Sequence, residues 1–304
     1  MSELPPLSLH AGLEQFIVIY MPSRNFARKT REEYTRDVGE LVAFLVQEGI
    51  EEWSQVGLQD LQAHLANLDA LNLKASTRNR KTYAIKTFFN CIAENGYLED
   101  NPADRLIPPK IPSKEPRFLS AEEYNTLLAQ ITSARDRAIV TLFLQTGLRL
   151  SELAKLQMSD LQLPKRVTRD PENVGMVKVN RKGSKVEYLP LNWKACDALA
   201  AWLRQHRNKY KEKATTTFVF LNKYGEPLSP RSIQRMVKKY LKRAGIEDAT
   251  VHTLRHTMAT HYAAKGGDIK SIQEMLGHAS LETTQIYVSL AKKVQQQMVQ
   301  NLAL

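Results

Sequence analysis

The sequence predicts a mainly α-helical fold in two domains, with one small antiparallel sheet in the second. Apolar residues recur at helical spacing through most of the first hundred residues. Only residues 176–191 alternate in the manner of a β-hairpin, with a turn at 182–184. The four prolines in residues 107–117 predict an extended linker, because proline fixes φ and donates no backbone hydrogen bond. We therefore expect one domain at 1–106 and another at 118–304, a division that suits the length of the chain.

The N-terminal domain is expected to consist of helices with short links. The predicted helices share apolar positions at i, i+3, i+4 and i+7, and glycines end two of them. They are an apolar segment at 13–20, a helix capped by Thr30 and ending at Gly49, a short helix at 58–68, and a helix capped by Ser76 and ending at Gly96.

The last of these helices begins with a basic stretch. Five basic residues and no acidic ones lie between Lys74 and Lys86. Arg78 and Lys81 are three residues apart and share a face near the start of the helix. We interpret them as candidate DNA-binding residues, because a basic helix end can lie against phosphates or in a major groove. The alternative is a solvated first turn.

The second domain is expected to open with a capping box formed by Ser120 and Glu123. An all-round apolar helix at 138–144 is typical of a buried element, and Gly147 ends it. The remaining predicted elements are the hairpin, a helix at 193–207, a third strand at 218–221, and a helix from Ser229-Pro230 to Gly245. This last helix is strongly basic, and its Arg231 and Arg235 are further candidate DNA-binding residues.

The charge of the chain is uneven. The whole chain carries a formal net charge of +11, yet residues 1–108 hold 11 Lys and Arg against 15 Asp and Glu, a net of −4. Residues 109–304 hold the other 32 basic residues against 17 acidic ones, a net of +15. A strongly basic second half favours a polyanionic partner, nucleic acid first and an anionic membrane surface second. A solvated basic surface is the alternative that charge alone leaves open.

Cysteine content and hydropathy restrict the class of protein. Cys91 and Cys196 are too few for a disulfide scaffold or a thiolate zinc site, and they indicate a reducing compartment such as the cytoplasm. The sequence has no run of about eighteen apolar residues, so we expect no membrane span. The N-terminal residues MSELPPLSLH lack a basic region followed by an apolar core, so we expect no signal peptide.

Titratable side chains concentrate near the C-terminus, where four of the seven histidines lie between His252 and Tyr287. Two guanidiniums can hold the non-bridging oxygens of a phosphodiester and stabilise a pentacoordinate transition state. A phenol oxygen can serve as nucleophile, and a histidine and a lysine can move protons. No carboxylate pair suited to magnesium accompanies these groups, which indicates chemistry without a metal or another cofactor. The candidate catalytic residues are Arg149, Lys182, His252, Arg255, His278 and Tyr287.

Histidines four residues apart raise the alternative of a zinc site. His252 and His256 have the spacing of a zinc-binding helix, but HTLRH lacks the glutamate of the HExxH motif. Arg255 between them would also be unfavourable beside a bound cation. We therefore expect no metal. We expect His256 and His261 to be ordinary helix residues that are not catalytic, with His256 packing beneath the site.

Five short segments together resemble the signature boxes of the tyrosine site-specific recombinases, also called the phage integrase family. They are TGLRLSEL (146–153), KGSK (182–185), HTLRH (252–256), LGH (276–278) and TTQIY (283–287). Any one of them is weak, but their order and spacing agree, and the resemblance covers essentially the whole chain. The compact length resembles the Xer-type or transposon-encoded members. Residues 162–175, before the hairpin, look longer than in a minimal member of the family, and we assign them no role.

The resemblance implies a role for each candidate residue. Arg149 and Arg255 look like the arginines that clamp the scissile phosphate, and Tyr287 looks like the nucleophile that forms a 3′-phosphotyrosine. His252 matches a proton donor or acceptor, and His278 matches a hydrogen-bond donor to the phosphate. Lys182 looks like the general acid for the leaving 5′ oxygen, with Lys185 as its rival. Glu152 resembles an acid that supports the site without touching DNA.

The resemblance also implies partners. The family's enzymes recombine double-stranded DNA with inverted half-sites as tetramers, through a Holliday junction, with accessory proteins as optional partners and no membrane. Residues 291, 294, 298 and 302 recur at helical spacing after the tyrosine, and we expect this tail to dock on a neighbouring protomer rather than on its own core. The predicted task is DNA integration, excision or resolution.

Other classes of function remain as alternatives. A non-catalytic architectural protein would bind DNA without cutting it. A type IB topoisomerase would use the same chemistry without a specific site. A surface protein that binds polyanions would show salt-sensitive binding and no covalent product.

Overall fold

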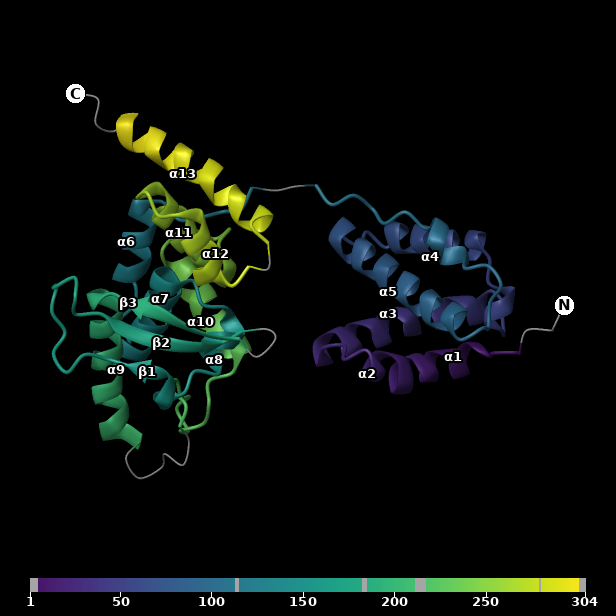
Figure 1. The fold of residues 1–304 in the computed structure, drawn as a ribbon, viewed down its shortest axis with the longest axis horizontal. Coiled ribbons are helices and arrows are strands. Elements are labelled where there is room, and N and C mark those ends of the chain that lie inside the picture. The colour runs from purple at the N-terminus through teal and green to yellow at the C-terminus, as the bar shows by residue number, and fades with distance from the viewer. Residues whose placement is uncertain (1–4, 113–114, 182–184, 211–216, 279, 301–304) are drawn as a thin grey trace. The chain divides into compact units, whose positions relative to one another are not determined.

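The computed structural model describes residues 5–112, 115–181, 185–210, 217–278 and 280–300, and only the backbone at 206–210 and 297–300. The chain forms two compact units, residues 1–114 and 115–304 (Figure 1). The prediction of a mainly helical fold with a small antiparallel sheet is confirmed. Within the described residues, no helix is both long enough and apolar enough to cross a lipid bilayer.

The N-terminal unit is a helical bundle around an aromatic core. Its helices are α1 (Leu9–Gln15), a π-helical turn (Phe16–Tyr20), α2 (Met21–Ser23), α3 (Arg28–Gln47), α4 (Leu58–Ala70) and α5 (Ala75–Glu94). The ring of Phe88 lies 4.4 Å from that of Trp53 and 5.3 Å from that of Phe16, centroid to centroid. All three rings are fully buried, so the apolar stripe predicted for α5 is the centre of this core.

Two predicted helix caps are wrong. The α3 helix begins at Arg28 rather than after Thr30, and α5 begins at Ala75 rather than after Ser76. Neither of the residues that precede these helices forms a side-chain cap. Each helix therefore extends N-terminally past a residue that could have capped it. In α3 this extension lets Arg28 form an ion pair with Glu32, at 2.9 Å.

The buried His64 of α4 makes the N-terminal unit sensitive to acid. It is 2% exposed, packs beside Phe44, and neither of its ring nitrogens has a hydrogen-bond partner among the described residues. Burial, and then the charge of Lys81, lowers the pKa of His64 to about 4. Between pH 6.5 and 4, His64 is therefore protonated in the unfolded chain but neutral in the folded unit. The free energy of unfolding falls as the pH falls through this window.

Replacing His64 by leucine is expected to reduce this acid sensitivity. The loss of stability from this group can reach about 1.4 kcal/mol per pH unit between pH 6 and 4. Differential scanning calorimetry at pH 7 and pH 5 should show a smaller drop in the melting temperature for His64→Leu than for the wild type. His10→Leu, a change at an exposed histidine, is the control and should keep the wild-type drop. An equal drop in both variants would contradict the assignment.

The C-terminal unit combines a three-stranded sheet with helices. The sheet has the order β1 (Leu161–Gln162), β2 (Gly175–Asn180), β3 (Val186–Leu191), and all pairs are antiparallel. Its helices are α6 (Ala121–Ala129), α7 (Ala134–Thr146), α8 (Leu150–Ala154), α9 (Trp193–Tyr210), α10 (Pro230–Arg243), α11 (Val251–Ala264), α12 (Ile269–Leu276) and α13 (Glu282–Gln300).

The hairpin prediction is confirmed by the pairing of β2 with β3, in which Val177 lies opposite Leu189. The predicted third strand is wrong: Phe218 and Leu221 form only isolated bridges, and the third strand is β1. The pairing segment that precedes β2 is only two residues long, which is too short to show a recognisable alternation in the sequence.

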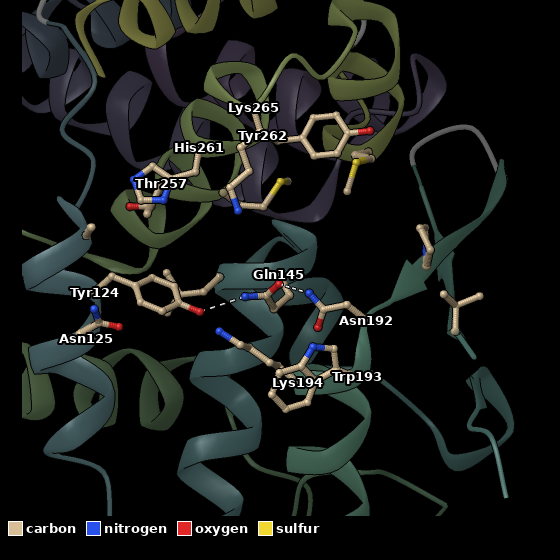
Figure 2. A pocket seen from close by; sticks show the side chains of 16 residues that line it. Tyr124, Asn125, Gln145, Asn192, Trp193, Lys194, Thr257, His261, Tyr262 and Lys265 are labelled. Carbon is tan, nitrogen blue, oxygen red and sulfur yellow. Dashed lines mark hydrogen bonds between the residues drawn. The ribbon is translucent and has the colours of Figure 1, made fainter. Parts of the chain in front are cut away.

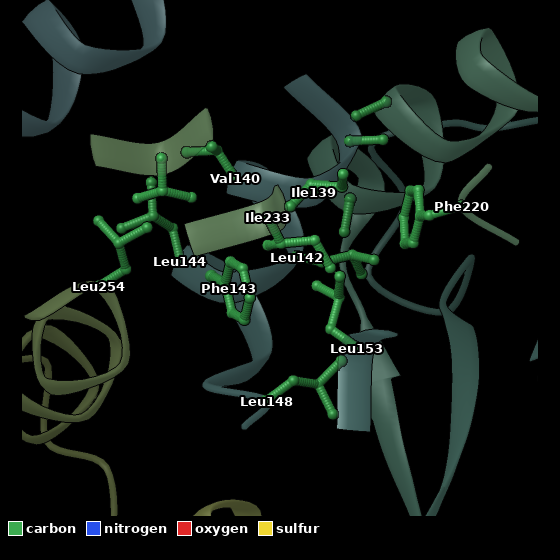
Figure 3. Packing of buried hydrophobic residues seen from close by; sticks show 14 of the residues in the cluster. Ile139, Val140, Leu142, Phe143, Leu144, Leu148, Leu153, Phe220, Ile233 and Leu254 are labelled. Atoms are coloured by element: carbon green, nitrogen blue, oxygen red, sulfur yellow. The ribbon is translucent and has the colours of Figure 1, made fainter. Parts of the chain in front are cut away.

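Helix α7 is the centre of the second core (Figure 3). Ile139, Leu142 and Phe143 are fully buried, and α7 packs against α9, α11 and β3. Gly147 ends it with φ of 63°, a left-handed conformation in which a Cβ would also lie 2.4 Å from Met258 Cε. The predicted buried helix and its glycine stop are therefore confirmed.

The last three helices form a small core of their own. Met258 of α11, Ile272 and Leu276 of α12, and Tyr287 and Leu290 of α13 pack together. Tyr287 belongs to this cluster, and α13, which carries it, packs against α11 of its own unit, with Ala291 and Val294 buried. In this single chain the tail thus packs on its own unit, and docking on a neighbouring protomer stays a prediction.

Candidate active site

Arg149 occupies the N-cap of α8, directly after the turn at Gly147. Its Nη1 donates to Glu152 Oε1 at 2.8 Å, and its backbone N–H donates to the other carboxylate oxygen at 2.7 Å. Its Nη2 donates to the carbonyl of Gly277 at 2.7 Å. The guanidinium of Arg149 is thus held by the Glu152 carboxylate and by the carbonyl of Gly277, the C-cap residue of α12. This contact is the one expected of Glu152 as a supporting acid.

Arg255 of α11 is 6% exposed, and its guanidinium also lies at the C-terminal end of α12. Its guanidinium donates to the carbonyls of Gly147 and Leu276. Burial, followed by the charge of Arg149, lowers the pKa of Arg255 to about 10. It therefore stays charged at pH 7 but lacks a carboxylate partner of its own among the described residues, so it is ready to bind an anion.

A third arginine, which the sequence did not predict for the site, also lies at the C-terminal end of α12. Arg181 follows β2 and is 8% exposed, and its Nη1 and Nη2 donate to the carbonyls of Leu276 and Met275, both at 2.7 Å. The alternation of β2 could have predicted the burial of Arg181. Val177 and Val179 face inward, and Arg181 follows at the same spacing, so it lies on the same inward face. The last two carbonyls of α12 and that of its C-cap residue Gly277 thus accept from three arginines, as the negative end of a helix favours.

Tyr287 lies between two histidines beside this cluster. Its hydroxyl and Nδ1 of His256 are hydrogen-bonded at 2.8 Å, and its ring lies 6.3 Å from that of His278, nearly parallel to it. It is only 1% exposed, and burial raises its pKa, so the phenol is protonated at pH 7. His256 was expected to be a packing residue, but it is the hydrogen-bond partner of the candidate nucleophile.

His278 follows the left-handed Gly277 at the end of α12. Its Nδ1 and the Thr284 hydroxyl are hydrogen-bonded at 3.1 Å. Burial, followed by the charges of Arg255 and Arg149, lowers the pKa of His278 to about 4. The ring is therefore neutral at pH 7 and can donate one hydrogen bond to a phosphate while the hydroxyl holds the other nitrogen.

The remaining candidates lie around this centre. His252 is exposed in the first turn of α11, one turn before His256. Lys182 lies outside the described residues. Lys185 is exposed and pairs with Glu187 at 3.2 Å. No three His, Cys, Asp or Glu residues in the described part of the chain are grouped as metal ligands.

The candidate DNA-binding residues differ from one another. Lys81 is wrong as a DNA contact: its side chain is 5% exposed and its Nζ binds Asp37 at 3.0 Å and Glu40 at 2.5 Å. The buried Asp37 pairs with both Arg80 and Lys81, so the ammonium of Lys81 is directed into the protein. Arg78 pairs with Asp69 at 2.7 Å and is partly exposed.

The basic helix α10 keeps its charges outside. Arg231 and Arg235 are both exposed, as are Lys238, Lys239 and Lys242 of the same helix, while Ile233 and Val237 are buried. The apolar face of α10 therefore packs on the core, and its basic face is free for a polyanion.

A cavity of about 550 Å³ lies elsewhere in the unit (Figure 2). Thr257, His261 and Lys265 line it from α11, and they recur every four residues on one face of that helix. None of the three arginines lines it, although Met275, whose carbonyl accepts from Arg181, is part of the lining. Across the cavity, Tyr124 hydroxyl accepts from Gln145 at 2.9 Å.

Comparison with known proteins identifies the family of this chain. The model of the phage integrase family matches residues 117–294, and that of the phage integrase N-terminal SAM-like domain matches residues 13–96. Tyrosine recombinase XerC of Bacillus pumilus is 32% identical over 286 residues, which cover 91% of this chain and 91% of that protein. XerC of Pseudomonas aeruginosa is 32% identical over 287 residues, covering 93% and 91%.

Solved structures show the same fold. The XerH recombinase in its post-cleavage complex with palindromic difH DNA has a TM-score of 0.73 at 22% identity, covering 94% of this chain and 84% of that one. A lambda integrase tetramer bound to a Holliday junction has a TM-score of 0.67 at 22% identity, covering 90% and 78%. With both domain models matched in order and relatives above 30% identity along nearly the whole chain, this protein belongs to the phage integrase family, the tyrosine recombinases.

Proposed function

We propose that this recombinase cuts and rejoins double-stranded DNA through a 3′-phosphotyrosine at Tyr287. The observation that carries the proposal is the convergence of Arg149, Arg255 and His278 on the C-terminal end of α12, beside the tyrosine. Two guanidiniums without a full complement of carboxylates suit one phosphodiester, whose non-bridging oxygens take hydrogen bonds from both.

The reaction balances without an external source of energy. The Tyr287 oxygen forms a bond to phosphorus, and the bond from phosphorus to the 5′ oxygen breaks. The phenol proton passes to a base, for which His252 is the candidate, and Lys182 supplies a proton to the leaving oxygen. Arg149 and Arg255 stabilise the charge of the pentacoordinate phosphorus, and His278 donates to the same group. Because the phosphotyrosine keeps a phosphodiester bond, the reverse attack by a 5′ hydroxyl rejoins the strand.

Both units are proposed to contact DNA. We infer that the exposed basic face of α10, with Arg231 and Arg235, contacts the phosphates near the site, and that the N-terminal unit contacts the same duplex from residues near Arg78. The boundaries 1–106, 107–117 and 118–304 remain the proposed domains and linker. The enzyme is proposed to act in the cytoplasm, on the DNA there.

The assembly is proposed to be a homo-tetramer on paired inverted half-sites that resolves a Holliday junction. The C-terminal part of α13 is proposed to dock on the neighbouring protomer. The palindromic substrate of XerH and the tetramer of lambda integrase on a Holliday junction support this proposal by likeness of fold. The task is proposed to be integration, excision or resolution of DNA, and a protein of like fold is the Tn1549 transposon integrase in complex with a circular intermediate DNA.

A nicked DNA substrate tests the function. Duplexes with candidate inverted repeats, nicked near the centre so that the cut fragment diffuses away, should trap an SDS-resistant adduct with the wild-type protein. A duplex with scrambled half-sites should give none, whereas a type IB topoisomerase would form adducts on both and relax any supercoiled plasmid. Specific binding with no adduct on any substrate would favour the architectural alternative.

A further inference from the structure

Arg181 is buried at a place where hairpins usually face solvent. Its side chain is 4% exposed, although it directly follows the last residue of β2. Its backbone N–H donates to the carbonyl of Lys185 at 2.8 Å, one residue before β3. An arginine is almost never buried unless its charge and its donors are paired. The hydrogen-bond and ion-pair partners of Arg181 therefore indicate its structural role.

The first partners are the last carbonyls of α12. The guanidinium donates to Met275 and Leu276, two groups that have no partner within the helix. A Cβ at Gly277 would lie only 2.5 Å from Arg181 Nη1, so the arginine lies flat against the left-handed turn that precedes His278. A cation at this end of a helix is also favoured by the helix dipole.

The other partners connect Arg181 to both arginines of the proposed clamp. Its Nη1 lies 3.4 Å from Glu152 Oε1, the oxygen that also accepts from Arg149. The carbonyl of Leu276 accepts from Arg181 and from Arg255 alike. Glu187 Oε2 adds an ion pair at 3.0 Å to Nε, without the alignment of a hydrogen bond.

We propose that Arg181 is a positioning residue of the phosphate clamp. It fixes the end of α12 and the carboxylate of Glu152, and through these shared acceptors it sets where Arg149, Arg255 and His278 point. It does not touch DNA, because its donors are directed into the protein. This inference rests on the proposed function, in that the clamp is taken to bind the scissile phosphate.

The first test measures the protein alone. The amides of Gly277 and His278 donate to Glu274 and Gln273 at the end of α12. Arg181→Met keeps the aliphatic stem and removes the donors, so hydrogen exchange at these two amides should become faster than in the wild type. Arg166→Met, which removes an exposed arginine of the same unit, should leave exchange unchanged. Unchanged exchange in Arg181→Met overturns the inference, whether or not the protein cleaves DNA.

The second test measures cleavage. Arg181→Met should bind nicked substrate like the wild type but form the covalent adduct about 100-fold more slowly, the cost of a misplaced clamp. A methylphosphonate at the scissile position carries no charge for the clamp to neutralise, so the difference from the wild type should shrink by about tenfold or more. A loosened fold would slow both substrates alike, and an undiminished difference overturns the inference.

Arg181→Lys guards against a failure of the methionine variant to fold. A lysine keeps the charge but cannot donate to two carbonyls and a carboxylate at once, so its defect should have the same dependence on the substrate at a smaller size. If the wild type and Arg166→Met form no adduct on any substrate, the proposed function fails. Faster exchange in Arg181→Met would then support only the link to α12.

Discussion

Replacing Tyr287 by phenylalanine should abolish the covalent protein–DNA adduct and leave DNA binding unchanged. The change removes only the hydroxyl, which is the proposed nucleophile. The ring stays buried in the core between α11, α12 and α13. The lost hydrogen bond to His256 costs about 1 kcal/mol, or a fall of about 2–4 °C in the melting temperature.

Denaturing gel electrophoresis after incubation with nicked DNA measures the adduct, and a mobility shift measures binding. Tyr262→Phe is the matched control, because Tyr262 is a 39% exposed tyrosine of α11. It should give the wild-type amount of adduct. An adduct formed by Tyr287→Phe would exclude Tyr287 as the nucleophile. Mass spectrometry of the wild-type adduct should place the nucleotide on the peptide that contains Tyr287.

The buried hydroxyl has a further consequence for the reaction. Tyr287 is 1% exposed and its oxygen is engaged by His256, so it cannot reach a phosphodiester without leaving this hydrogen bond. The proposed attack by Tyr287 therefore requires that the phenol rotate outward or that α13 shift. Since burial raises the pKa of Tyr287, exposure beside Arg255 would also make the phenol easier to deprotonate.

Replacing Arg255 by alanine should slow adduct formation about 10³-fold at saturating protein, because one of the two guanidiniums that stabilise the transition state is lost. The carbonyls of Gly147 and Leu276 also lose a donor, which loosens the site. Single-turnover cleavage of nicked DNA measures the effect. Arg166→Ala, a change of an exposed arginine, is the control and should cleave like the wild type.

The pH dependence of Arg255→Lys tests the same residue by its charge. The pKa of Arg255 is lowered to about 10 by burial and by Arg149, so the wild-type clamp keeps its charge up to about pH 9. An ammonium in the same place has a lower ordinary pKa and meets the same burial, so it should lose its proton at a lower pH than the arginine does. Cleavage by Arg255→Lys should therefore decline with rising pH before that of the wild type. Parallel pH profiles would show that the charge at this position does not limit the reaction.

Helices and their order could be predicted from the sequence because their signals are local. The apolar stripe of α5, the all-round apolar α7, the glycine stop at Gly147 and the alternation in the β2–β3 hairpin each lie within a few residues. The family could be recognised for a similar reason, since its boxes are short and contiguous. The starts of α3 and α5 and the third strand were mispredicted, because capping patterns recur inside helices and β1 is two residues long, whereas the caps at Ser120 and Ser229 are confirmed.

Long-range contacts decided the rest. The sequence by itself determined the two-domain helical architecture, the hairpin and the set of candidate residues with Tyr287 among them. Only the tertiary structure decided that Lys81 neutralises a buried Asp37 instead of facing outward. It also decided that Arg181 joins Arg149 and Arg255 at the end of α12, and that His256 holds the tyrosine hydroxyl. These roles depend on partners that lie 31 to 95 residues away in the chain, and the side chain itself carries no sign of which partner it will meet.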